Sequence, residues 1–165
     1  MSDIKTASAL AKDKRFNEAI EVLDSFYSQG EASRDDLIKI IPYFQEAGRY
    51  SEVEVYCEKV IIPNLKNDNE SVFSHKCVEI REAFFNLALH KMYAKISLCA
   101  KREKIKVEEE KYSKLSDDTF EKYQSQLVLG ESIEDCKGFE QVQETFGRDL
   151  DDWPSIFKIK YQHFL

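Results

Sequence analysis

Apolar residues recur every three to four positions along most of the chain, which is the spacing of one face of an α-helix. In the first 60 residues this pattern predicts helices over residues 2–12, 16–27, 34–47 and 51–60. Gly30 and Gly48 lie where helix C-terminal caps belong, and Ser33 lies where an N-cap belongs. Pro42 is expected to kink the third helix, and Pro63 to end the fourth, because proline cannot donate the helical hydrogen bond.

The second half of the chain carries longer apolar stripes. Residues 71–100 contain neither glycine nor proline and predict one long helix, and residues 101–114 read as its exposed continuation. Two further helices are expected, one between Ser116 and Gly130 and one between Ser132 and Gly147. The last segment, residues 153–165, favours a helix because Pro154 suits a first helical position, although its alternating apolar residues also allow a strand.

Length and composition agree with this helical pattern. The chain has 165 residues, a length typical of one domain, and only five glycines and three prolines. A β-sandwich or barrel would need turn residues far more often. We therefore expect a single all-α domain over residues 1–165, in which residues 1–66 form helical hairpins, residues 67–115 a long helix and residues 116–165 the C-terminal helices.

The first two hairpins repeat each other in sequence. Residues 14–23 (KRFNEAIEVL) align with residues 48–57 (GRYSEVEVYC) at an offset of 34 residues, which places Phe16 above Tyr50. This pattern resembles the tetratricopeptide repeat (TPR), whose 34-residue unit is a pair of antiparallel helices with an aromatic residue at the turn between them. The resemblance covers residues 1–66 and implies antiparallel helical hairpins stacked in a right-handed array. The apolar pattern of the second half adds a long central helix and a helical C-terminal cap.

TPR-like arrays bind peptides or proteins on the concave surface that the first helix of each hairpin lines. The resemblance therefore implies a non-catalytic adaptor or scaffold that holds a protein partner. Carried over position by position, it assigns the groove to Lys5, Ser8, Lys12, Lys39, Pro42, Gln45 and Glu46.

The charge distribution supports a second hypothesis. The net charge is −7, and residues 116–165 hold 11 acidic against 5 basic side chains. Such an acidic surface would suit a dedicated inhibitor, for example an immunity protein or antitoxin that covers the active site of a basic toxin or enzyme. In that case Asp149, Asp151 and Asp152 would contact the partner.

Other functional classes lack support in the sequence. The acidic balance disfavours nucleic-acid binding, and no apolar run is long enough to cross a membrane. Cys57, Cys77, Cys99 and Cys136 show no metal-ligand spacing, and their apolar helical positions favour free thiols in a cytoplasmic protein. Neither the histidines nor the paired carboxylates form a known catalytic arrangement. We therefore expect no cofactor, no metal and no enzymatic activity.

Overall fold

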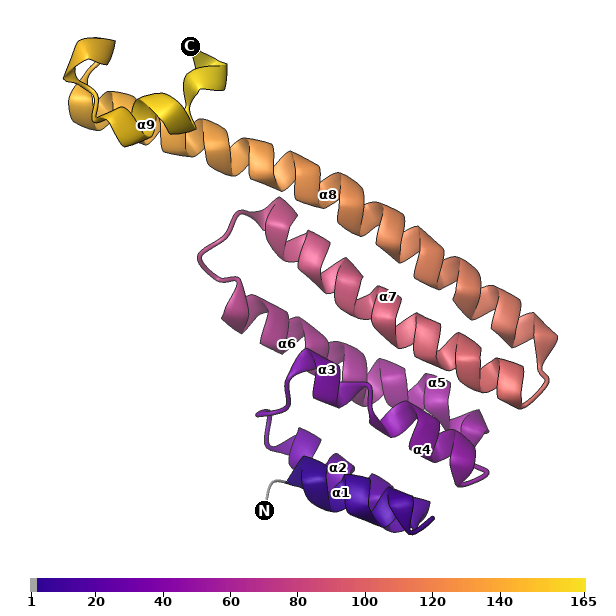
Figure 1. Cartoon of the computed structure of the whole chain (residues 1–165). Helices are drawn as coiled ribbons and strands as arrows, with labels where there is room; N and C mark the ends of the chain where they lie inside the picture. The colour runs from indigo at the N-terminus through magenta and orange to yellow at the C-terminus, as the bar shows by residue number, and fades with distance from the viewer. Residues whose placement is uncertain (1–2) are drawn as a thin grey trace.

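The computed structural model describes residues 3–165, and every regular element in that range is helical (Figure 1). The α-helices are α1 (Asp3–Lys12), α2 (Phe16–Ser28), α3 (Arg34–Leu37), α4 (Ile40–Glu46), α5 (Val53–Tyr56), α6 (Ile62–Val72), α7 (Val78–Arg102), α8 (Lys106–Phe146) and α9 (Ser155–Lys160). Shorter 3-10 turns cover Tyr50–Glu52, Leu150–Asp152 and Gln162–Phe164. The all-α prediction is confirmed, and the last segment is helix rather than strand.

The helices form three successive antiparallel pairs that stack side by side (Figure 1). The first pair is α1 packed on α2. In the second pair, α3 and α4 form the first arm and α5 and α6 the second. In the third pair, α7 packs on α8 along the whole length of α7. Buried apolar residues from all three pairs form one continuous core, from Ala7 and Leu23 through Ile41 and Leu65 to Met92. The amphipathic pattern of the sequence thus becomes the inner face of each layer.

The same backbone turn joins the two helices of every pair. Its central residue has a positive φ in each case: 59° at Lys14, 73° at Gly48 and 61° at Lys104. The following N–H then donates to the carbonyl five residues back, in the pairs Arg15–Leu10, Arg49–Phe44 and Ile105–Ala100. This Schellman geometry satisfies the last carbonyls of each first helix. The prediction that residues 101–114 continue the long helix was wrong, because the chain reverses at Lys104.

Proline had different effects at its two helical positions. The predicted kink before Pro42 is confirmed, because the helix is interrupted at Ile38 and Lys39, where the ring would meet the carbonyl four residues back. Pro63 does not end its helix. The chain instead widens into a π-helical turn at Cys57–Ile61 and continues through Pro63 to Val72. A π-turn relieves the same steric conflict without stopping the helix.

A single helix, α8, replaces the two helices expected between Ser116 and Gly147. It runs through Gly130 and Ser132 and ends only at Gly147. Gly130 is buried, and a Cβ atom at this position would lie 2.5 Å from the Cγ1 atom and 2.9 Å from the backbone nitrogen of Ile80. This glycine therefore allows α7 to approach α8 closely, and does not act as a cap.

The long helix α7 begins later than its apolar stripe suggested, at Val78 rather than Ser71. Its N-terminus is capped from another helix: the backbone N–H of Cys77 donates to Oε1 of Glu134 at 2.8 Å. This hydrogen bond, with help from Lys76, holds the pKa of Glu134 below its usual value. A carboxylate at a helix N-terminus also interacts favourably with the helix dipole.

We expect Glu134→Ala to lower the free energy of unfolding by about 1 kcal/mol, the usual value of a helix cap. Because the folded-state pKa of Glu134 is depressed, the cap is fully present above the unfolded pKa and is lost as pH falls through the folded pKa. Urea denaturation curves of the wild type and of Glu134→Ala should therefore differ at pH 7 and converge in acid. Glu131→Ala, an exposed position on the same helix, should leave stability unchanged. A Glu134→Ala effect that persists at low pH would contradict the charge-based cap.

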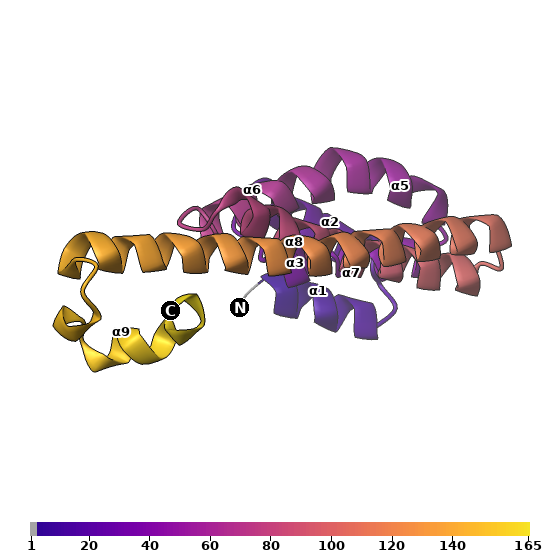
Figure 2. The same ribbon diagram turned by 90° about the horizontal axis from the view of Figure 1, so that it is seen from above.

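Beyond Gly147 the chain folds back on the far end of α8, well away from the stacked pairs (Figure 2). We call residues 147–165 the C-terminal hook. Val142, Trp153 and Tyr161 form its buried centre, surrounded by Phe139, Phe146 and Phe157. Trp153 also donates from Nε1 to the carbonyl of Gly147 at 2.9 Å. The hook therefore has a small hydrophobic cluster of its own, separate from the main core.

Candidate functional site

Helix α1 lies on the side of the molecule opposite α5 and α6 (Figure 2). Between α1 and α4 the surface is hollowed, with a volume of about 540 Å³. We call this feature the α1–α4 hollow. Its lining residues come from two successive pairs and are Ser8, Ala11, Lys12, Lys14, Phe16, Pro42, Tyr43 and Glu46.

The floor of the hollow is apolar and its rim is charged. Phe16 and Tyr43 are both half-buried, and their ring centroids lie 6.2 Å apart. The Lys12 and Lys14 side chains are exposed at the rim. Glu46 is also exposed, 4.0 Å from the guanidinium of Arg102 on α7. The hollow can therefore accept an apolar side chain against the two rings while the rim pairs with charged or polar groups.

The structure brings together four of the seven groove residues predicted from the sequence: Ser8, Lys12, Pro42 and Glu46 all line the hollow. The other three lie outside its lining. Lys5 is exposed on α1, Lys39 pairs with Asp36 at 2.6 Å, and Gln45 donates to Glu103 at 2.7 Å.

Sequence reasoning missed four of the lining residues, Ala11, Lys14, Phe16 and Tyr43. The sequence pattern places Phe16 at the turn between helices and does not assign Tyr43 to the groove. Tyr43 lies three residues before Glu46, which the resemblance assigns to the groove, so helical spacing was the available signal.

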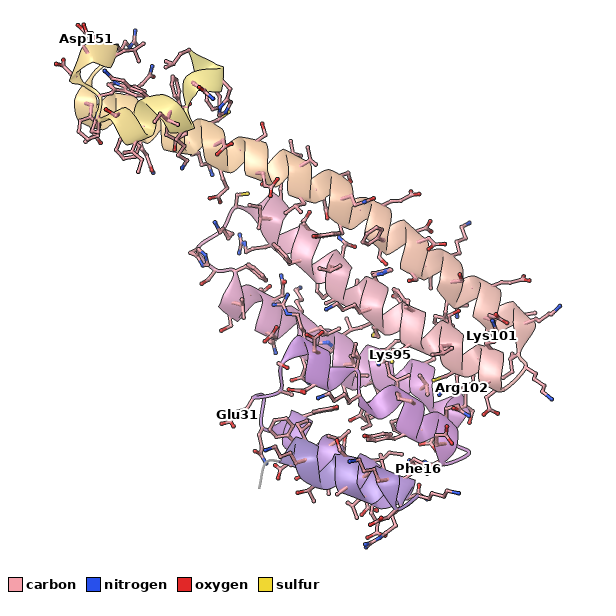
Figure 3. All side chains as sticks on the ribbon, in the orientation of Figure 1. Phe16, Glu31, Lys95, Lys101, Arg102 and Asp151 are labelled. Atoms are coloured by element: carbon pink, nitrogen blue, oxygen red, sulfur yellow. The ribbon has the colours of Figure 1, made fainter. Side chains whose placement is uncertain are left out.

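Figure 3 labels Lys95, Lys101 and Arg102 on α7, and Phe16 on the first pair, with the second pair between them. Lys91, one turn before Lys95, pairs with Asp35 at 2.9 Å and so joins α7 to the second pair.

The three predicted inhibitory aspartates lie at the opposite end of the molecule, in the C-terminal hook (Figure 3). Asp149, Asp151 and Asp152 are all exposed. Asp149 caps the short 3-10 turn, because its Oδ1 accepts from the backbone N–H of Asp151 at 3.0 Å. The two surfaces predicted from the sequence are therefore separate, and a partner that covers one need not touch the other.

The two buried cysteines inside the stack, Cys57 and Cys99, behave as apolar core residues. Burial raises the pKa of Cys57 to about 12 and also raises the pKa of Cys99, so both thiols stay protonated at neutral pH. A thiol in that state is a poor nucleophile and a poor metal ligand. Within residues 3–165 no group of three or more His, Cys, Asp or Glu side chains is placed to hold a metal ion.

One serine–histidine pair has the distance of a hydrogen-bonded dyad. The hydroxyl oxygen of Ser116 lies 2.9 Å from Nδ1 of His90. Ser116 is only 5% exposed, however, and its hydroxyl also lies 3.2 Å from the carbonyl of His90. The pair therefore links α7 to α8 inside the helix interface. A hydroxyl enclosed in this way presents no oxygen to a substrate.

Comparison of the chain with protein-family models, with curated proteins and with solved structures returned no match. None of the helices in residues 3–165 combines the length and the apolar character that a membrane span needs.

Proposed function

We propose that the protein is a non-catalytic, TPR-like binding module, an adaptor or scaffold that holds a segment of another protein in the α1–α4 hollow. The observation that carries the proposal is the hollow itself, in which Phe16 of the first helical pair meets Tyr43 of the second beside two exposed lysines of the first pair. Stacked helical pairs commonly bind extended peptides on such a surface.

The TPR-like part of the proposal is supported by local geometry that repeats at the 34-residue offset. Arg15 pairs with Glu18 in the first turn, and Arg49 pairs with Glu52 in the second, in both cases through two guanidinium contacts. Arg49 also donates to Asn17 at 3.2 Å and so links the second turn to α2. Residues at equivalent positions of the two copies thus form equivalent ion pairs.

The experiment is capture of partners from native cells by the tagged protein, with identification by mass spectrometry. Ser8→Arg would fill the hollow and Lys12→Glu would reverse the charge of its rim, and both positions are solvent-accessible on α1. We expect either substitution to reduce capture about tenfold, the effect of losing one good contact. Lys122→Glu, on the exposed surface of α8, is the matched control and should capture normally. Equal capture by all four chains would overturn the proposal.

A second candidate, the acidic inhibitor, is favoured by the exposure of Asp149, Asp151 and Asp152 at one end of the molecule. Changing these three residues together to lysine should abolish binding of a basic partner but leave binding in the hollow intact. Wild-type capture of such a partner should also slow steeply with added salt, because exposed charges are screened within about 10 Å at 0.1 M. A partner that tolerates both the reversal and the salt is not held by these aspartates.

A further inference from the structure

The α1–α4 hollow lies on a basic face of an otherwise acidic protein. Ser8 and Lys12 line the hollow from α1, and Lys14 lines it from the turn that follows. At 100° per residue, Lys5 lies within about 20° of Lys12 around α1, so both lysines are on the same side of the helix. Lys5, Lys12 and Lys14 are exposed, and within residues 3–165 none of them has an ion-pair or hydrogen-bond partner.

Helix α7 borders the same face beyond α3 and α4 (Figure 3). Lys91 pairs with Asp35 at 2.9 Å, and Arg102 lies 4.0 Å from Glu46, which itself lines the hollow. Both pairs join residues that are 56 positions apart in the sequence. Helix α7 therefore runs parallel to α3–α4 in a single register.

The same offset of 56 positions places Lys95 opposite Lys39. Lys39 pairs with Asp36 at 2.6 Å, whereas the half-buried Lys95 has no ion-pair or hydrogen-bond partner in the part of the chain that the structure describes. Asp36 thus offsets only one of the two facing charges. Two facing ammonium groups repel each other, and an anion between them turns this repulsion into attraction. The position therefore favours a bound carboxylate.

The carboxylates of this face are already paired with cations of the chain itself. Asp35, Asp36 and Glu46 each lie within 4.0 Å of a lysine or arginine. Two further carboxylates lie in the turns: Asp13 follows α1, and Glu103 accepts a hydrogen bond from α4 at 2.7 Å. The cations left without a partner are Lys5, Lys12, Lys14 and Lys95. The unpaired charge of this face is therefore mainly positive.

We propose that the segment held on this face is acidic and extended, with one apolar side chain among its carboxylates. The apolar side chain contacts Phe16 and Tyr43 in the hollow. The carboxylates pair with Lys5 and Lys12 on one side and with Lys95 on the other. Neighbouring helices pack about 8–10 Å apart, so the path from α1 across α4 to α7 is about 20 Å long, or about six extended residues. The proposal rests on the binding function assigned to the hollow and adds the chemistry of the partner.

Fluorescence anisotropy with a labelled peptide of about nine residues, longer than this path, tests the chemistry. The probe carries glutamates on both sides of a central leucine, and its C-terminus is amidated so that only side-chain carboxylates are present. We expect binding that weakens with added salt. The same peptide with glutamine in place of glutamate should bind at least about tenfold more weakly. No binding of the acidic probe up to about 1 mM, or equal binding of the two peptides, overturns the proposal.

The variant Lys5→Glu/Lys95→Glu reverses two of the unpaired charges without altering the lining of the hollow. It should bind the acidic probe about tenfold more weakly, because each reversal replaces an attraction with a repulsion. Lys59→Glu/Lys122→Glu is the matched control, since it changes the net charge equally. Lys59 is exposed on the π-helical turn, on the side opposite α1, and Lys122 is exposed on α8 (Figure 2). Equal affinity of the two double variants would mean that overall charge attracts the probe, and would overturn the proposal.

The variant Ser8→Arg separates this proposal from the function on which it rests. If Ser8→Arg abolishes capture of cellular partners and Lys5→Glu/Lys95→Glu leaves it unchanged, the binding function stands and the acidic partner is overturned. If neither variant changes capture, both are overturned.

A nucleic acid and the acidic hook of a second copy are the other occupants that a basic face could attract. Tighter binding of a single-stranded oligonucleotide than of the acidic peptide would assign the face to nucleic acid. Self-association in sedimentation velocity that Lys5→Glu/Lys95→Glu abolishes would assign it to a second copy. Either result overturns the proposal.

Discussion

Replacing Gly130 with alanine should lower the free energy of unfolding by about 2 kcal/mol, within the range measured for overpacked cores. The added methyl would lie 2.9 Å from the backbone nitrogen of Ile80, which cannot move without displacing the first turn of α7. Alanine is favoured over glycine in a helix by about 1 kcal/mol. The steric cost of the added methyl group must exceed this gain in helix propensity. We expect it to do so because the methyl group meets backbone atoms, which cannot rotate away.

Urea denaturation followed by circular dichroism measures the effect of Gly130→Ala. Ile80→Ala removes the Cγ1 contact but leaves the backbone contact. Measured in the Ile80→Ala background, Gly130→Ala should therefore lower the free energy of unfolding by less than it does in the wild type, but not by zero. Ser132→Ala, an exposed position two residues further along α8, serves as the control and should change stability by less than about 0.5 kcal/mol. An increase in stability on Gly130→Ala would mean that helix propensity decides at this position and that α7 and α8 are further apart.

Gly130 also shows what the sequence could not indicate. A glycine that follows an amphipathic stretch is typical of a helix cap, and Gly147 does end α8 in that way. At Gly130 the deciding fact is the approach of Ile80, which lies 50 positions earlier in the chain. The start of α7 is set in the same manner, by the carboxylate of Glu134. Local pattern predicted the helical class and most of the apolar faces, but boundaries that depend on distant contacts could not be read from it.

The turns between helices also differ in how far the sequence predicts them. Gly48 is an ordinary signal for a positive φ, whereas Lys104 adopts nearly the same conformation without any such signal. The carbonyl–amide pattern of the first two turns recurs around Lys104, so the third pair reuses their geometry with different residues. For the candidate site, the resemblance placed Ser8, Lys12, Pro42 and Glu46 on one surface, and all four line the α1–α4 hollow; their contact with a partner stays a prediction. The ring of Tyr43 was missed because its exposure depends on how α1 packs beside α4.

The C-terminal hook should unfold before the stacked pairs do. Its buried cluster is small and separate from the main core, so its local stability is low by comparison. Trp153 is the only tryptophan in the chain and is 3% exposed at the centre of that cluster. In urea, tryptophan fluorescence should therefore change at a lower midpoint than the circular dichroism of the whole chain.

Trp153→Ala should remove most of the hook's stability, because deleting a buried tryptophan side chain costs about 3–5 kcal/mol. The hydrogen bond from its indole N–H to Gly147 is lost as well. Hydrogen exchange read by mass spectrometry should then show amides of residues 147–165 exchanging at nearly unfolded rates, while those of α7 keep their protection. Ile156→Ala, at an exposed position of α9, is the control and should leave exchange in the hook unchanged. Loss of protection throughout the chain, or fluorescence and dichroism transitions that coincide in the wild type, would show that the hook and the stacked pairs unfold as one cooperative unit.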